Sequence, residues 1–136
     1  PDVLCIDYAD VLAHITKRYD KLDQIKETWE ELRKLNQELH CLLVTATQVK
    51  AAAYGKKLMD RSDFGENHLK YAECTGMIGI NMTPDEKDNQ TMRLNWIVRR
   101  EGAYSSRKVV HVVGCLALAN PCVLSAMRKR EEQPKG

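Results

Sequence analysis

Apolar and polar residues alternate in blocks along the chain, and the first block is an unbroken apolar run. Residues 2–8 read DVLCIDY, which predicts a strand buried on both faces. After Asp20, which can cap a helix, apolar residues recur at three- and four-residue spacing with charges between them. They are Leu22, Ile25, Trp29, Leu32 and Leu39. The spacing predicts an amphipathic helix whose apolar stripe, Trp29 included, belongs to the core.

This helix runs directly into a second apolar block, CLLVTAT, at residues 41–47. A strand, a helix and a strand with such short joins predict a βαβ unit with parallel strands and a right-handed crossover. Residues 68–76 are compatible with a short helix, and residues 77–81 predict a third strand. The stretch 82–91, rich in Asp and Asn and containing Pro84, predicts a turn-rich loop. Two further strand-like runs, 92–100 and 107–115, predict a β-hairpin with a loose turn.

Together these elements predict an α/β fold in which parallel strands with a crossover helix precede a C-terminal β-hairpin. We expect residues 1–119 to form the folded part and the charged residues 120–136 to fray. The chain starts at Pro1, directly before the first strand, whereas a domain usually begins with a frayed lead-in. We therefore expect a segment of a longer α/β domain.

Composition and charge are those of a soluble globular protein. The 136 residues are 43% hydrophobic and 29% charged, with a net charge of +2, which allows one domain with a real core. No apolar run reaches the roughly 18 residues of a membrane span, and no signal peptide is evident, so we expect a cytoplasmic protein without membrane contact. Five cysteines without CxxC spacing favour reduced thiols, and four scattered histidines argue against zinc.

Candidate chemistry begins at the carboxyl ends of the first two predicted strands. Asp7 ends the first strand, where open α/β sheets bind ligands and where nucleotide-hydrolysing proteins hold Mg²⁺ on an aspartate. The structural alternative is simply a parallel strand that ends in Asp. Thr45, Thr47 and Gln48 follow the second strand, and a glutamine there could sense a γ-phosphate.

A basic segment, residues 48–67, comes immediately after Gln48 and contains Gly55 and Gly65 as helix breakers. Its four cations are Lys50, Lys56, Lys57 and Arg61. Each cation could neutralise a phosphate of a nucleic-acid strand. Tyr54 could either stack on a nucleobase or pack against the foot of its own loop, where the loop joins the rest of the fold. The alternative is a solvated surface segment.

Four stretches resemble, in order and spacing, the later part of RecA-like ATPase domains, in particular those of DnaB-type hexameric replicative helicases and their phage relatives. They are VLCIDYADVL (3–12), LLVTATQVK (42–50), RSDFGEN with YAECTGMIGIN (61–81), and LNWIVRREG (94–102). The resemblance covers residues 2–115. It implies an ATP-driven helicase motor that uses ATP and Mg²⁺, acts on single-stranded DNA in replication, and assembles as a homo-oligomeric, hexameric ring.

The resemblance also implies roles for individual residues. Asp7 matches the Walker B aspartate, which positions magnesium, and Gln48 matches the glutamine that senses the γ-phosphate, with Thr47 beside it in the nucleotide site. Four cations fall in the loop that faces single-stranded DNA in the ring's channel: Lys50, Lys56, Lys57 and Arg61. Ser62 and Asp63 resemble the start of a short motif near that channel.

An arginine finger, which stabilises charge on the nucleotide of a neighbouring subunit, is implied at Arg99 or Arg100. In the family a lysine stands two residues before the finger arginine. If Arg100 is the finger, that position is Val98 in this chain. The choice between the two arginines therefore stays open, as does the structural alternative of two charges that end a strand.

The phosphate-binding motif GxxxxGK[ST] is not found in the sequence. The nearest match, YGKKL at 54–58, has Lys50 where the first glycine is required and Leu58 where a hydroxyl residue is required. We therefore expect the 136-residue chain alone to hydrolyse no ATP, although its parent protein does. Two alternatives stay open: a RecA-like recombinase or assembly factor, and a non-catalytic module for DNA binding or oligomerisation.

Overall fold

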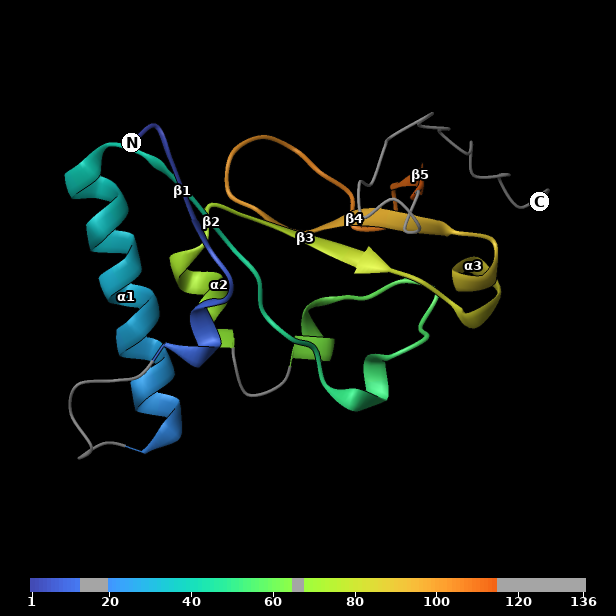
Figure 1. Cartoon of the computed structure of the whole chain (residues 1–136), viewed down its shortest axis with the longest axis horizontal. Helices are drawn as coiled ribbons and strands as arrows, with labels where there is room; N and C mark the ends of the chain where they lie inside the picture. The colour runs from blue at the N-terminus through green and yellow to red at the C-terminus, as the bar shows by residue number, and fades with distance from the viewer. Residues whose placement is uncertain (13–19, 65–67, 115–136) are drawn as a thin grey trace. The chain divides into compact units, whose positions relative to one another are not determined.

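The computed structural model describes residues 1–12, 20–64 and 68–114 (Figure 1). These residues divide into two compact units. The first unit combines Pro1–Lys50 with Phe64–Thr75, and the second combines Ala51–Asp63 with the chain from Gly76 onward. Both units mix helices with strands, which confirms the predicted α/β class. The predicted frayed tail, residues 120–136, lies outside the described residues.

The first unit contains the predicted parallel strand pair. Strand β1 (Val3–Ile6) pairs with β2 (Leu42–Thr45) in parallel, with Ile6 opposite Thr45. Helix α1 (Lys21–Leu39) connects the two strands, and the 3-10 helix η1 (Ala9–Val11) follows β1. Helix α2 (His68–Glu73) also belongs to this unit and confirms the predicted short helix.

The core of this unit forms on one face of the strand pair. Trp29 and Leu32 of α1 are buried with Ala9 of η1, so the assignment of Trp29 to the core is confirmed. The prediction that the first strand is buried on both faces is wrong. Val3 is 51% exposed, and Cys5 is exposed too, because successive side chains of a strand point to opposite faces and α1 packs on one of them.

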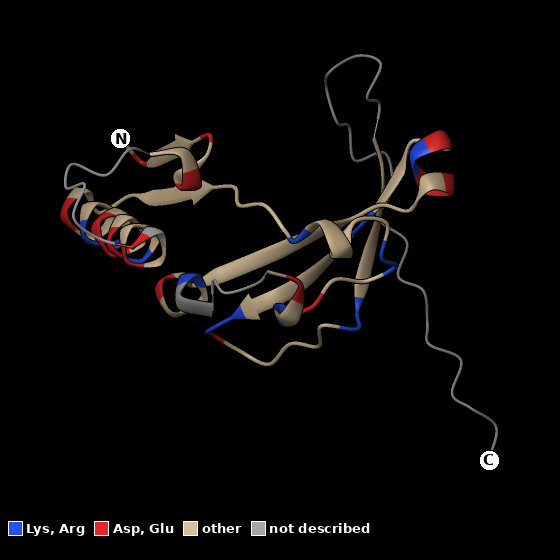
Figure 2. Cartoon of the chain, turned by 90° about the horizontal axis from the view of Figure 1, so that it is seen from below, with Lys and Arg blue, Asp and Glu red and all other residues tan. Residues whose placement is uncertain are grey.

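Helix α1 is followed directly by a residue in the left-handed conformation, and its outer face carries charged residues. His40 has φ 50°, and the N–H of Cys41 donates to the carbonyl of Asn36 at 3.2 Å, which closes the helix and turns the chain into β2. Basic and acidic residues are interspersed along α1 (Figure 2), including an i,i+4 pair between Lys26 and Glu30 at 3.7 Å. This face is the expected solvated side of an amphipathic helix.

The second unit is built on a three-stranded antiparallel sheet in the order β3-β4-β5. The strands are β3 (Gly76–Asn81), β4 (Thr91–Arg99) and β5 (Val109–Val113). The antiparallel pairing of β4 with β5 confirms the predicted hairpin. Two 3-10 helices lie in the basic segment, η2 (Ala51–Ala53) and η3 (Arg61–Phe64).

The predicted loop 82–91 contains a short helix, α3 (Pro84–Asp88), so that part of the loop prediction is wrong. The cause is a capping box. The Thr83 hydroxyl accepts from the N–H of Glu86 at 3.3 Å, and the Glu86 carboxylate accepts from the N–H of Thr83 at 2.9 Å. Pro84 stands at the start of the helix, where its missing N–H costs nothing.

Candidate functional site

The carboxyl ends of β1 and β2 bring three of the predicted site residues to one edge of the strand pair. Asp7 follows β1, whereas Thr47 and Gln48 follow β2. Because Ile6 pairs with Thr45 at the ends of the two parallel strands, the segments after β1 and β2 leave the sheet at the same edge. Asp7 is exposed, and the exposed side-chain amide of Gln48 donates to the Tyr8 hydroxyl at 3.1 Å.

Thr45 ties the two segments together at the point where they leave the sheet. Its hydroxyl donates to the carbonyl of Ile6 at 2.9 Å and accepts from the N–H of Ala9 at 2.9 Å. Because both contacts reach across to the segment after β1, the backbone on either side of Asp7 is held against the end of β2.

An ionic cluster lies beside this edge, and sequence reasoning missed it. Its members are Asp10, Trp29, Thr47 and Lys70. The Lys70 ammonium donates to Asp10 Oδ1 at 2.5 Å and to the Thr47 hydroxyl at 2.8 Å. The Thr47 hydroxyl donates to Asp10 Oδ2 at 2.6 Å, and Trp29 Nε1 donates to Asp10 Oδ1 at 3.3 Å. The four residues come from four separate segments of the first unit.

The charges in this cluster compensate one another. Lys70 is 2% exposed, and its ammonium lies 5.5 Å from the centroid of the Trp29 ring, a cation–π distance. Burial of Asp10 opposes its ionisation, but the hydrogen bonds from Lys70 and Thr47 and the Lys70 charge outweigh burial and lower the pKa of Asp10. Asp10 is therefore a carboxylate that forms an ion pair with Lys70.

Asp7 is a second carboxylate at this edge, and it lies outside the ionic cluster. Among the described residues, no three His, Cys, Asp or Glu side chains gather that could hold a metal ion by themselves. A single carboxylate still fits Mg²⁺, because proteins commonly hold that ion with one or two carboxylates together with phosphate oxygens and water.

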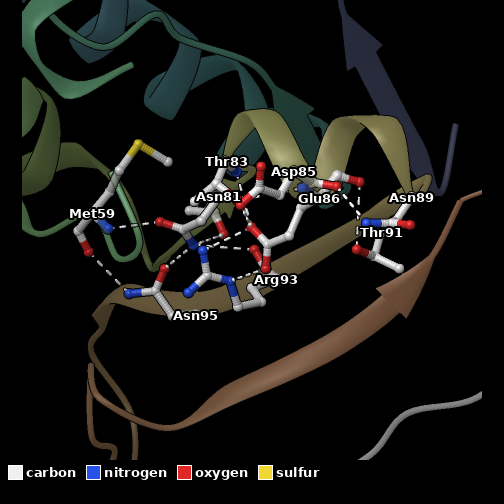
Figure 3. A network of polar contacts seen from close by, with 10 residues as sticks. Met59, Asn81, Thr83, Asp85, Glu86, Asn89, Thr91, Arg93 and Asn95 are labelled. Atoms are coloured by element: carbon white, nitrogen blue, oxygen red, sulfur yellow. Dashed lines mark hydrogen bonds and ion pairs between the residues drawn. The ribbon is translucent and has the colours of Figure 1, made fainter. Parts of the chain in front are cut away.

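The basic segment is anchored in the second unit by two buried asparagines (Figure 3). Asn81 Oδ1 accepts from the N–H of Met59 at 2.6 Å, and Asn95 Nδ2 donates to the carbonyl of Met59 at 3.1 Å. The asparagines also bond to each other, from Asn81 Nδ2 to Asn95 Oδ1 at 2.8 Å. A Cβ at Gly79 would lie 2.7 Å from Asn95 Oδ1, so the glycine makes room for this amide pair.

The predicted cations of the basic segment have different surroundings. Lys56 forms an ion pair with the buried Asp63, and the hydrogen bond to that carboxylate raises the pKa of Lys56. The Arg61 guanidinium donates to the Tyr104 hydroxyl at 3.0 Å. Lys57 is exposed in the second unit, and Lys50 is exposed at the end of the first unit.

The two finger candidates lie at the end of β4. Arg99 is the last residue of the strand, and its guanidinium carbon lies 5.6 Å from the centroid of the Trp96 ring. Arg100 follows directly, and both arginines are exposed. Tyr54 is 67% exposed, which does not favour the interpretation that it packs against the base of its segment.

No protein-family model and no curated protein sequence matches the chain. The solved structures that share its fold include two that cover most of this chain. One is a structure of an ATPase domain, which matches with a TM-score of 0.77 at 15% identity, covering 90% of this chain and 44% of that one. The other, described as a DnaB-like replicative helicase and its interactions with primase, matches with a TM-score of 0.70 at 17% identity, covering 82% of this chain and 27% of that one.

The chain therefore has a partial RecA-like α/β fold and spans less than half of either matched chain. More specifically, it shares its fold with that ATPase domain and with the DnaB-like replicative helicase, which confirms, for the fold, the resemblance seen in the motifs. In the described part of the chain, no helix is long and apolar enough to cross a membrane.

Proposed function

We propose that this chain is a segment of an ATP-driven DNA helicase motor that acts on single-stranded DNA in replication. One observation carries the proposal: Asp7, Thr47 and Gln48 meet at the carboxyl ends of two parallel strands, in a fold shared with helicase ATPase domains. Ligands of open α/β sheets bind at that end of the strands. The nucleotide of this motor is ATP with Mg²⁺.

Within this proposal, the residues at the strand ends have separate roles. Asp7 would hold Mg²⁺, which neutralises phosphate charge when bound. Gln48 senses the γ-phosphate, and its side chain is exposed and hydrogen-bonded to Tyr8, so it can exchange that partner for a ligand without leaving a buried group unpaired. Thr47 lines the nucleotide site through its backbone, because its hydroxyl is engaged by Asp10 and Lys70.

The basic segment supplies the contacts with DNA. Lys50 and Lys57 are exposed and present their charge to phosphates, whereas Lys56 and Arg61 act from positions fixed by Asp63 and Tyr104. Asn81 and Asn95 pin Met59, so the segment leaves the sheet from a fixed point. A segment with a fixed attachment point has less conformational entropy to lose when DNA binds.

Arg99 or Arg100 supplies the finger to a neighbouring copy, and the assembly is a homo-oligomeric ring, hexameric in the parent protein. Both arginines are exposed at the end of β4, as a contribution to another subunit requires. We also propose that the 136-residue chain alone hydrolyses no ATP, because its sequence contains no phosphate-binding motif.

The DNA role is tested by fluorescence anisotropy of a labelled oligo-dT with the purified chain. For Lys57→Glu we expect weaker binding, and a slope of log K against log salt that is smaller by about 0.7 for the lost phosphate contact. The matched control is Lys34→Glu, which makes the same charge change at an exposed position of α1. Equal effects of the two variants would argue for unspecific charge attraction and against a DNA-binding segment.

A further inference from the structure

Lys70 is a buried cation whose contacts lie next to the proposed nucleotide residues. We propose that Lys70 is a positioning residue, which holds Asp10 and Thr47 in place and through them sets the positions of Asp7 and Gln48. The inference rests on the proposed function, because it assigns Lys70 to the site that Asp7 and Gln48 would form.

The geometry of the ammonium group supports this role. Lys70 is 2% exposed, and it donates to Asp10 Oδ1 at 2.5 Å and to the Thr47 hydroxyl at 2.8 Å. The same hydroxyl donates to Asp10 Oδ2 at 2.6 Å, so the three side chains form a closed ring of hydrogen bonds. Since charge-assisted hydrogen bonds are shorter and stronger than neutral ones, the ring holds its members more firmly than neutral contacts would.

The chain positions of the two held residues connect the ring to the site. Thr47 directly precedes Gln48, so the orientation of the Thr47 side chain constrains the backbone from which the Gln48 amide extends. Asp10 lies in η1, three residues after Asp7, and the hydroxyl of Thr45 fastens the same segment through Ala9. Lys70 stands on α2, so a single ammonium group joins that helix to both strand ends.

A lysine with this role differs in a measurable way from a lysine that only stabilises the core. A core ion pair contributes stability, and its loss leaves the remaining folded molecules with an unchanged site. A positioning residue alters the site in molecules that are still folded. The hydrogen bond from Gln48 Nε2 to the Tyr8 hydroxyl, 3.1 Å long, reports the position of the site without any ligand.

The test is NMR of the ¹⁵N-labelled 136-residue chain, in which the side-chain amide signals of Gln48 are followed at a temperature where each variant is folded. We expect Lys70→Met and Thr47→Val to shift these signals and to speed their exchange with water, through loss of the bond to Tyr8. Thr47→Ser keeps the hydroxyl and should leave the signals near their wild-type positions. Lys34→Met, the same substitution at an exposed site on α1, is the matched control and should leave them unchanged.

Asp10→Asn/Lys70→Met keeps the test decisive if Lys70→Met alone does not fold. This double variant removes both charges, so we expect stability to recover while the Gln48 signals stay shifted. Recovery of stability together with wild-type Gln48 signals would overturn the positioning role, and so would an unshifted Gln48 in folded Lys70→Met. A separate arm adds Mn²⁺ to the wild-type chain. If the backbone amide signal of Asp7 is not broadened, the result counts against the metal role of Asp7 but not against the positioning role of Lys70, which is then tested by the Gln48 signals alone.

Discussion

Each of the two units buries a small polar cluster, and the two clusters are of different chemical kinds. In the first unit the cluster is ionic, with Lys70 donating to Asp10. In the second it is neutral, with the amides of Asn81 and Asn95 bonded to each other and to Met59. Removal of one partner leaves a buried charge in the first unit but only unpaired dipoles in the second, which makes the first the more vulnerable.

The two clusters also differ in what they join. The ionic cluster connects four segments, η1, α1, the chain after β2, and α2, beside the residues proposed to serve the nucleotide. The amide cluster fastens one segment, the basic one, to β3 and β4. The ionic cluster therefore joins helices α1 and α2 of the first unit to the ends of its two-stranded sheet, whereas the amide cluster fixes one loop to a three-stranded sheet.

The largest expected effect is that of Lys70→Met on the first unit. Because the substitution leaves Asp10 largely buried without its cation, we expect a loss of about 3 kcal/mol in unfolding free energy. Urea denaturation measures this loss, and amide hydrogen exchange should show faster exchange in β1 and β2 than in β3 and β4. An equal acceleration in both sheets would remove the proposed difference between the units.

The next effect is that of Asn81→Ala on the second unit. It removes the acceptor of the Met59 N–H and the donor to Asn95 Oδ1, so we expect a loss of roughly 1–3 kcal/mol. Asn89→Ala removes an exposed amide from the same unit and should cost about 0.5 kcal/mol or less. Here hydrogen exchange should quicken in β3 and β4 and stay unchanged in β1. If Asn81→Ala proves as costly as Lys70→Met, the charge of the first cluster is not what distinguishes it.

The smallest expected effect is that of acid, because the pKa of Asp10 reflects burial and hydrogen bonding acting in opposite directions. Its folded-state pKa is lowered, so the stabilisation is present above the ordinary value of 3.8 and is lost as pH falls through the folded-state pKa. Urea unfolding at pH 7 and pH 3, followed through the indole signals of Trp29 and Trp96, should show this loss at Trp29.

Asp10→Asn/Lys70→Met provides the reference for the acid experiment. It should lose less stability at Trp29 on acidification, while the response at Trp96 should match that of the wild-type chain. Glu86 in the second unit also has a lowered pKa: burial opposes its ionisation, but the N–H of Thr83 and the side chain of Arg93 outweigh it. The response at Trp96 therefore serves as an internal comparison, and an identical response at Trp29 in wild type and double variant would exclude Asp10 as its cause.

Much of the fold could be predicted from periodicity. The three- and four-residue spacing around Trp29 predicted α1, and the run of short joins predicted the parallel pairing of β1 with β2. The failures have local causes. Thr83 and Glu86 form a capping box, which outweighs the turn-forming residues around them and produces a short helix. The prediction that β1 is buried on both faces failed because the strand is too short for its sequence to show which face α1 covers.

The candidate site was only half predictable. Asp7, Thr47 and Gln48 follow apolar runs, and strand ends are where ligand residues are sought, so a sequence can indicate them. Lys70 cannot be recognised in this way, because a lysine in a short polar helix is indistinguishable from a solvated one until its partners are known. Asn81 is only weakly recognisable from the sequence as a buried polar residue, because it stands two residues from Gly79 on the inward face of β3.

Strand β3 has a consequence for how the chain behaves with copies of itself. Among the described residues it is one of the two edge strands of its sheet, it contains no charged residue or proline, and its outward-facing Ile78 and Ile80 are 53% and 63% exposed. Natural sheets protect such strands with lysine, proline or bulges, and the bulge of β3 lies at one end only, between Met77 and Ile78. We therefore expect intermolecular strand addition to compete with the monomer as protein concentration rises.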